Sequence, residues 1–302
     1  FVYEAIPSCV APTAITPSNE TATSADFSWT AGAAQTAWNV EYGVDGFVRG
    51  GGTGTAVAVT TNPYSITGLT ANTDYDIYIQ ADCGNGDVSG WVGPISFTTL
   101  CESFSTFPYL ESFETITSGQ PDCWSLEGTT TSASYHFSSF ATGQTGRGMR
   151  FNSYNNSTGR TSELITPEID ASALTSLELN FQYKNPAGGD FEILISNDGG
   201  STFTSLESGL IGQSSWTLKN YDLTSYISSS MKVKFKGTSN WSSSFSGSHI
   251  FLDEVGIRAI PNCFAPTALA ASNLTATSAD FTWVTGGTGN VYNFEYGTPG
   301  FT

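Results

Sequence analysis

The chain has 302 residues, with 27 acidic against 10 basic side chains and a net charge of −17. Such a surface repels phosphate backbones, which argues against nucleic-acid binding. Apolar residues make up 39% of the chain, enough for packed cores, and no apolar run approaches the roughly 20 residues that span a bilayer. Frequent Thr, Ser, Gly, Asn, Phe and Tyr predict an all-β fold with many turns.

An internal repeat sets the domain organisation. At an offset of 254, residues 5–47 and 259–301 are identical at 25 of 43 positions, including the runs TATSADF and EYG. Residues 1–4 precede the first copy as residues 255–258 precede the second. We therefore expect a tandem array of two alternating domain types, of which this sequence is an interior piece. Residues 1–8 would be the tail of a preceding jelly-roll domain and a linker.

Residues 9–101 are predicted to form a sandwich of about seven short strands. Alternating residues indicate strands over 25–30, 38–42, 56–61, 64–66, 75–81 and 94–99. Phe27 and Trp29 are expected to point inward. The segment resembles the fibronectin type III family through Trp29, Tyr42 and the pair Leu69 and Tyr75, which matches that family's tyrosine corner.

This resemblance implies a disulfide. In such a sandwich the start of the first strand and the end of the sixth lie at the same pole, and Cys9 and Cys83 occupy these places. We therefore expect a Cys9–Cys83 bridge, and a partner beyond residue 302 for Cys263, the counterpart of Cys9. No cysteine belongs to a CxxC pair and the chain has two histidines, so a zinc site is not expected.

Residues 102–258 are predicted to form a jelly-roll sandwich of about ten strands. Alternation is clear over 177–184, 191–195 and 231–236, and NDGG (197–200) predicts a hairpin turn. The order of phrases, from PYLESFE and PDCW to LISNDGGSTF and IFLDEVGI, resembles MAM-like jelly rolls and cleaved-adhesin-type domains of secreted bacterial proteins. A second bridge, Cys101–Cys123, is expected here, and two bridges imply an oxidising, extracellular setting.

The same resemblance implies a structural calcium ion between the first and last strands of the jelly roll. Glu111 or Glu114 and Asp253 are its candidate ligands, since Ca²⁺ prefers carboxylate and carbonyl oxygens. Asp122 is a weaker candidate. The alternative is that these acids are surface charges or turn caps.

Three aromatic residues in polar, loop-like stretches are candidates for glycan binding: Tyr135, Tyr154 and Trp241. For Trp241 the alternative is a lid over the core.

Lysines line one face of the strand at 231–236, at positions 232, 234 and 236. They either meet an acidic polysaccharide or pair across strands with acids such as Glu178 and Glu192.

Catalysis is not expected. Catalysis needs a base or nucleophile held beside a partner, and His136 and His249 lie outside any G-x-S-x-G or H-E-x-x-H context.

Residues 259–302 are predicted to be the N-terminal part of a second fibronectin type III domain. The whole then resembles repeats of large surface adhesins of gliding and biofilm-forming bacteria, exported by type IX secretion. This implies an extracellular, cell-surface segment whose partners are glycans or surfaces and neighbouring repeats. The alternatives are glycan-binding accessory modules of a secreted polysaccharide hydrolase or protease, and a passive spacer.

Overall fold

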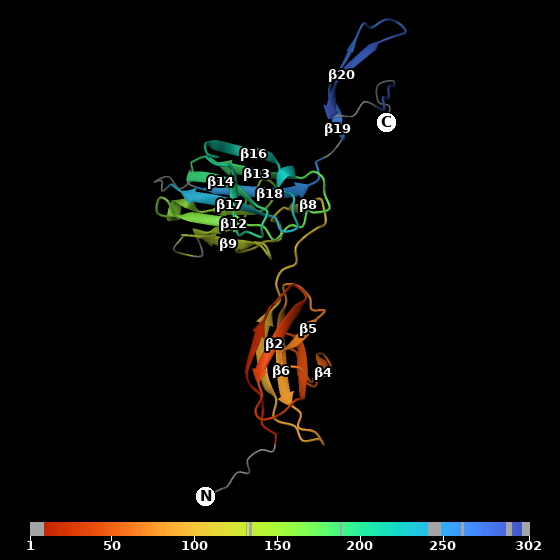
Figure 1. Cartoon of the computed structure of the whole chain (residues 1–302). Helices are drawn as coiled ribbons and strands as arrows, with labels where there is room; N and C mark the ends of the chain where they lie inside the picture. The colour runs from red at the N-terminus through yellow and green to blue at the C-terminus, as the bar shows by residue number, and fades with distance from the viewer. Residues whose placement is uncertain are drawn as a thin grey trace.

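The computed structural model describes residues 9–130, 132, 135–187, 189–240, 249–260, 263–287 and 292–297. These residues form antiparallel sheets and short 3-10 turns, which confirms the all-β class. Figure 1 shows two sandwiches in succession along the chain, followed by a two-stranded hairpin.

Seven strands make the first sandwich, in two sheets of order β1-β2-β5 and β4-β3-β6-β7. They are β1 (Thr13–Ser18), β2 (Ser24–Thr30), β3 (Trp38–Val44), β4 (Thr55–Val59), β5 (Tyr64–Thr67), β6 (Asp74–Ala81) and β7 (Val92–Thr98). Because side chains alternate along a strand, each sheet turns one row of apolar residues toward the other.

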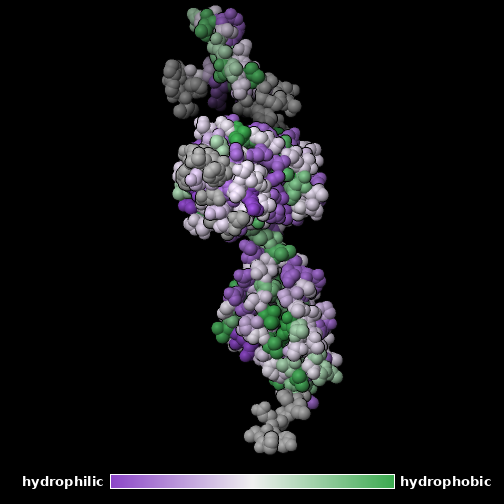
Figure 2. Space-filling model, turned by 90° about the vertical axis from the view of Figure 1, so that its left-hand side faces the viewer, coloured by the Kyte–Doolittle hydropathy of each residue, from purple (hydrophilic) through white to green (hydrophobic). Residues whose placement is uncertain are grey.

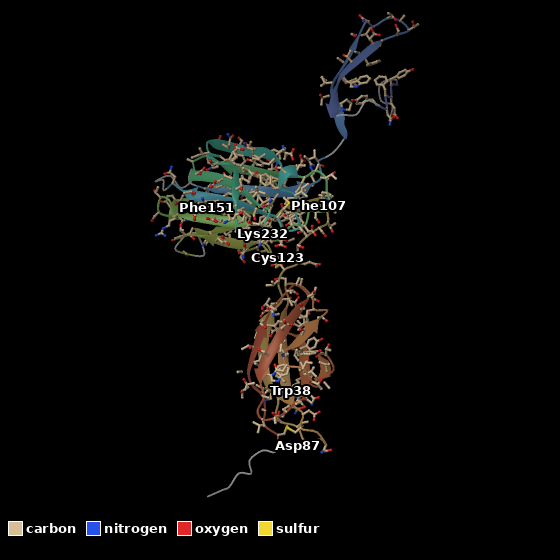
Figure 3. All side chains as sticks on the ribbon, viewed as in Figure 1. Trp38, Asp87, Phe107, Cys123, Phe151 and Lys232 are labelled. Carbon is tan, nitrogen blue, oxygen red and sulfur yellow. A yellow bond between two sulfur atoms is a disulfide. The ribbon has the colours of Figure 1, made fainter. Side chains whose placement is uncertain are left out.

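The core of the first sandwich is aromatic. Phe27 and Trp29 point inward, as predicted, with exposed fractions of 0% and 6%. The Phe27 ring meets Phe97 edge-on at 4.9 Å, and Trp29 meets Trp38 at 5.2 Å. Figure 3 shows Trp38 between the two sheets. These edge-to-face contacts add to the free energy gained by burying the rings.

The predicted tyrosine corner is present. The Tyr75 hydroxyl accepts a hydrogen bond from the Thr70 backbone N–H at 2.9 Å, while its ring is buried beside Phe97. This bond fastens the loop between β5 and β6 to the core.

Replacing Tyr75 by phenylalanine should lower the free energy of unfolding of this sandwich by about 1 to 2 kcal/mol, because the Thr70 N–H loses its partner. Urea unfolding of the full chain measures this change. Tyr78→Phe is the matched control, since Tyr78 lies on the outward side of the same strand. Equal effects of the two substitutions would contradict the corner's role.

Eleven strands make the second sandwich, with two short 3-10 turns, η2 (Ser153–Asn155) and η3 (Thr224–Tyr226). One sheet has the order β10-β11-β18-β13-β16, with β8 also beside β18, and the other has the order β15-β14-β17-β12-β9. The strands are β8 (Tyr109–Glu111), β9 (Ser125–Gly128), β10 (Phe137–Phe140), β11 (Gly148–Phe151), β12 (Thr161–Ile165), β13 (Glu178–Asn185), β14 (Gly189–Ser196), β15 (Thr204–Glu207), β16 (Gln213–Asp222), β17 (Lys232–Ser239) and β18 (Ile250–Arg258).

The core of the second sandwich is separate from that of the first. The Phe181, Phe191 and Phe235 rings meet at its centre and are fully buried. Figure 3 shows Phe151 inside the same sandwich. The predicted alternation over 177–184 is confirmed, and the NDGG turn joins β14 to β15, which pair antiparallel.

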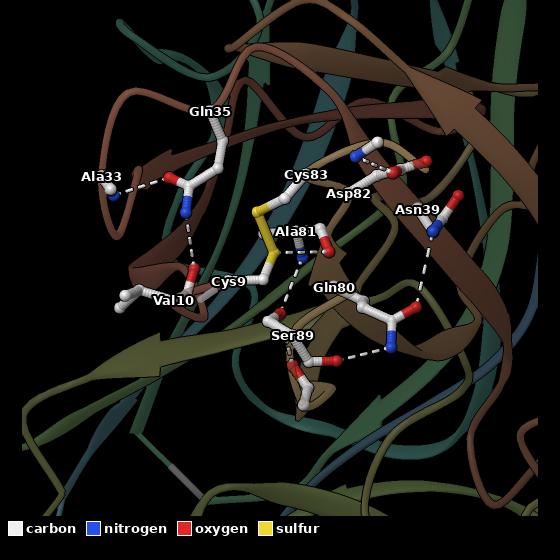
Figure 4. The surroundings of a disulfide bond; sticks show 12 residues. Cys9, Val10, Ala33, Gln35, Asn39, Gln80, Ala81, Asp82, Cys83 and Ser89 are labelled. Atoms are coloured by element: carbon white, nitrogen blue, oxygen red, sulfur yellow. Dashed lines mark hydrogen bonds between the residues drawn. A yellow bond between two sulfur atoms is a disulfide. The ribbon is translucent and has the colours of Figure 1, made fainter. Parts of the chain in front are cut away.

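Both predicted disulfides are present. Cys9 and Cys83 are joined at one end of the first sandwich, and Cys101 and Cys123 are joined where the chain enters the second. Figure 4 shows the first bridge, beside which the Gln35 side chain donates to the Val10 carbonyl at 3.0 Å. The side chain of Cys263 lies outside the described residues.

The segment between the sandwiches is held at both ends. The Leu100 N–H donates to the Thr21 carbonyl of the first sandwich at 2.9 Å, and the Phe104 N–H donates to the Glu168 carbonyl of the second at 3.0 Å. Only residues 101–103 separate these anchors, and Cys101 is itself bridged to the second sandwich.

The terminal hairpin repeats the first hairpin in detail. It consists of β19 (Cys263–Ser272) and β20 (Asp280–Gly287). The Asn273 amide donates to the Asp280 carboxylate at 2.7 Å, as Asn19 does to Asp26 at 2.8 Å. Both asparagines have positive φ, at 48° and 51°, where asparagine is one of the few residues commonly found. The sequence repeat is therefore a repeat of structure.

Candidate binding site

Asp253 lies in β18, in the gap between the stretch that pairs with β11 and the stretch that pairs with β8. Its side chain is fully buried. Its carboxylate accepts backbone N–H bonds from Gln144 at 2.6 Å, Thr145 at 3.3 Å and Glu254 at 2.9 Å. Asp253 thus holds the loop before β11 in place. Its burial agrees with the expectation that this carboxylate lies at the edge of the core rather than on the surface.

Of the two glutamates, only Glu114 is seen to bind that loop. Its Oε2 accepts from the Arg147 N–H at 3.1 Å. Glu111 instead accepts from the Phe113 N–H at 2.7 Å, closing a local turn in which Phe113 has a φ of +58°. Burial raises the pKa of Glu111.

The calcium prediction has a chemical basis here. Asp253 is a buried carboxylate with no cationic partner among the described residues, and such a group is costly unless neutralised. Glu114 reaches the same loop and offers a second carboxylate of the kind that Ca²⁺ binds. The described residues contain no group of three or more His, Cys, Asp or Glu placed to hold a metal. Any further ligands would therefore have to be carbonyl oxygens or water.

Burial raises the pKa of Asp253 to about 6, against the opposing effect of its three N–H donors. Its protonated form is therefore favoured in the folded state, and it contributes stability below about pH 4 that is lost as the pH rises through 6. In calcium-free buffer we expect a loss of about 2 to 3 kcal/mol from this group between pH 4 and pH 7. Denaturant titrations of wild type and Asp253→Asn measure it; parallel pH profiles would contradict the assignment.

Tyr135 and Tyr154, the predicted glycan contacts, come from segments that the structure brings together. The buried Asn156 side chain donates to the carbonyls of Tyr135 at 3.2 Å and Asn152 at 3.0 Å. Both tyrosines remain partly exposed. Trp241 lies outside the described residues, so its predicted role stays a prediction.

Two of the three lysines of β17 are paired, while no ion pair of Lys232 is found among the described residues. Lys236 binds Glu192 at 3.1 Å, as the pairing hypothesis predicted, and Lys234 binds Glu163 at 2.7 Å. The predicted partnership with Glu178 is wrong, because Glu178 belongs to the other sheet and binds Arg258 at 2.5 Å. Lys234 and Lys236 therefore have their charges matched within their own sheet.

One serine and histidine do lie side by side. The Ser162 hydroxyl is 3.3 Å from His136 Nδ1, but it also accepts the Phe137 N–H at 2.8 Å, and Ser162 is fully buried. A nucleophile must reach its substrate, and a buried hydroxyl does not. We therefore interpret this pair as a structural contact that links β10 to β12.

Comparison with known families bears on the first sandwich. Residues 10–98 match the family model of the fibronectin type III domain. The chain contains a fibronectin type III domain. Its seven strands, tyrosine corner and buried Trp29 are the features expected of that domain from the sequence.

Solved structures similar to this chain include two cleaved adhesin domains of Lys-gingipain from Porphyromonas gingivalis W83. The K1 domain is 21% identical with a TM-score of 0.40, covering 52% of this chain and 100% of that one. The K3 domain is 17% identical with a TM-score of 0.35, covering 49% and 97%. A fibronectin type III domain of the human collagen α-1(XX) chain is 20% identical with a TM-score of 0.30, covering 34% and 97%. The search of curated proteins gave no match.

Among the described residues, no helix is long and apolar enough to cross a membrane. In Figure 2 hydrophilic residues cover most of the visible face of the second sandwich. The visible face of the fibronectin type III domain carries more hydrophobic residues than that of the second sandwich.

A row of aromatic and cationic side chains was missed by the sequence reasoning. It crosses the outward face of the six-stranded sheet from β10 to β16, and we call it the aromatic–cationic row: Phe140, Arg150, Phe251, Lys184 and Trp216. Phe251 stands directly opposite Arg150 on one side and Lys184 on the other. All five side chains are partly exposed.

The contacts within the aromatic–cationic row are close. The Arg150 guanidinium lies over the Phe140 ring at 4.5 Å, and the Lys184 ammonium lies 5.5 Å from the centre of the Phe251 ring. Phe251 also meets Phe140 at 5.5 Å and Trp216 at 6.2 Å. The row is therefore one continuous surface.

Proposed function

We propose that this chain is a non-catalytic repeat segment of a large extracellular adhesin or filament that attaches a cell to surfaces. One observation carries the proposal: the hairpin of β1 and β2 recurs as β19 and β20 with the same turn, register and hydrogen bonds. The first hairpin of the fibronectin type III domain thus recurs after an unlike sandwich, which supports an array of alternating modules. Arrays of this kind expose the same surfaces many times, which multiplies weak binding.

The two disulfides and the net charge of the chain support an extracellular location. Two disulfides persist only in oxidising surroundings. The net charge of −17 favours solubility of a long array. In this proposal the array stands on the cell surface and its neighbours are further copies of itself. We further propose that the array is exported by type IX secretion in a gliding bacterium. Fractionation of cells that lack this secretion system tests the proposal. Display of the protein on the surface of such cells would contradict it.

Attachment is tested with beads that carry the full 302-residue chain. Under shear flow they should stay on polysaccharide-coated glass longer than beads that carry serum albumin. Equal retention would favour the passive spacer. A catalytic domain beside a few copies in the full-length protein would instead favour an accessory module of a secreted hydrolase or protease.

We also propose that Asp253 and Glu114 bind a structural Ca²⁺ together with oxygens of the loop before β11. Support comes from the burial of Asp253 and from the shared loop. Calcium at millimolar concentration should then raise the melting temperature of the second sandwich, and a chelator should reverse the rise. Asp253→Asn should abolish the response, whereas Asp122→Asn, at an exposed position, should keep it. No response of the wild type would remove the proposal.

A further inference from the structure

We propose that the aromatic–cationic row binds an acidic polysaccharide, one whose sugar rings carry carboxylates. The proposal rests on the proposed function and names the ligand class through which the second sandwich attaches. It places the contact on the outward face of the sheet that contains β13, β16 and β18 (Figure 1).

The aromatic residues provide the surface for sugar rings. In this sheet the inward positions are already apolar, since Phe151, Ile250 and Leu252 are fully buried. The outward neighbours Phe140, Phe251 and Trp216 therefore add apolar area on the solvent side, where a sheet face normally carries polar residues. Partly exposed aromatic rings with a few convergent polar groups are the usual lining of sugar-binding surfaces.

The two cations provide the charge. Neither Arg150 nor Lys184 makes an ion pair or hydrogen bond with another described residue, and Arg150 Nε is a buried donor without a partner. A half-buried guanidinium without an acceptor gains most from a carboxylate, which it can bind through two parallel hydrogen bonds. In a chain with 27 acidic and 10 basic residues, two such cations on one surface are exceptional.

The rest of the second sandwich offers less to an anion. On the opposite sheet Lys234 and Lys236 are matched by glutamates, and Lys219 on β16 is matched by Glu207 at 2.8 Å. At these three lysines a polyanion would have to displace an existing partner, whereas Lys232 is a single lysine of the opposite sheet without an ion pair among the described residues. The aromatic–cationic row has no such competitor among the described residues, so charge complementarity favours it.

The geometry favours a linear polymer. The row runs across five neighbouring strands, from β10 through β11, β18 and β13 to β16. At about 4.8 Å between strands this spans about 19 Å, the length of several sugar rings rather than one. Aromatic and cationic side chains alternate along this line, so rings and carboxylates of one polymer meet their partners in turn.

The test is calorimetric titration of the full chain with polygalacturonate, with neutral β-1,4-galactan and polyglutamate as comparison polymers. Polygalacturonate should bind, more weakly at high salt because charges are screened. Lys184→Gln, Arg150→Gln and Trp216→Ala should each weaken binding about tenfold or more. Thermal melts identify any variant that fails to fold, and Lys184, on the solvent side of its strand, is the safest position.

Two control variants are matched to these. Lys236→Gln removes a lysine from the opposite sheet. Arg49→Gln removes an arginine that stacks on Trp91 at 4.9 Å in the fibronectin type III domain. Both should bind polygalacturonate as the wild type does. Equal weakening by either control and by Lys184→Gln would overturn the location.

The remaining outcomes separate this inference from the proposed function. Polyglutamate that binds as tightly as polygalacturonate would overturn recognition of sugar rings. Binding of galactan alone would overturn the acidic ligand, while attachment of coated beads would still uphold the adhesin. Polygalacturonate binding without any retention of beads would keep the inference and contradict the proposed function.

Discussion

Replacing Cys9 and Cys83 together by serine should lower the free energy of unfolding of the fibronectin type III domain by about 4 kcal/mol. The bridge joins residues 74 apart in the sequence, from the strand-free start of the domain to the residues after β6. Closing so long a loop removes much of the conformational entropy of the unfolded chain. A small domain with a net stability of about 5 to 15 kcal/mol then loses a large share of it.

Urea unfolding of the full chain, followed by tryptophan fluorescence, measures this loss. The double replacement of Cys101 and Cys123 is the matched control, because that bridge spans 22 residues and lies at the entry of the second sandwich. Loop entropy predicts about 3 kcal/mol there, confined to the second transition. A loss below about 1 kcal/mol for the first pair would show that the bridge constrains little.

Phe235→Ala should lower the free energy of unfolding of the second sandwich by about 4 kcal/mol. The ring is fully buried in the five-stranded sheet and meets Phe181 edge-on at 5.2 Å and Phe191 at 6.4 Å. Alanine would leave a cavity beside Phe181 of the facing sheet and Phe191 of the same sheet, and the rigid strands cannot fill this cavity by collapsing.

Scanning calorimetry separates the two domains if their cores are independent. The transition of the fibronectin type III domain should not move in Phe235→Ala, because the two hydrophobic clusters share no residue. Leu218→Ala is the control, since Leu218 is 53% exposed on the outward face. A shift of both transitions would show that the sandwiches unfold as one unit.

Much of the fold follows from local pattern. Phe27, Trp29 and the run at 177–184 alternate with polar residues, and a period of two assigns each side chain to a face without knowledge of the partner strand. Tyr75 and the two cysteine pairs were found through a family resemblance that fixes where strands start and end. These predictions needed no cross-strand register.

The aromatic–cationic row could not be found in this way. Alternation places Lys184 on the outward side of its strand, yet Phe251 and Arg150 come from parts of the sequence far from it. Only the pairing of β13, β18 and β11 makes them neighbours. The error about Glu178 has the same origin, since the sequence does not tell which of two sheets a strand joins.

The candidate calcium ligands were partly predictable. Asp253 was placed at the core edge by its position between Leu252 and Val255, both buried. The loop that it holds lies more than 100 positions earlier in the chain, and its backbone N–H groups leave no signal in the sequence.

The Cys9–Cys83 bridge also limits how far the chain lengthens under tension. Figure 1 shows the chain entering the first sandwich at one end and leaving at the other, so a pull on the array passes through the whole domain. If the strands separate under tension, the bridge prevents the 74-residue span between its cysteines from extending. Fully extended, this span would measure about 250 Å. Only the residues after Cys83 can then extend, to a total length of roughly 50 Å. Pulling single molecules before and after reduction measures both lengths, and equal extensions would contradict this account. A tether built of such units therefore stretches little before neighbouring tethers share the load.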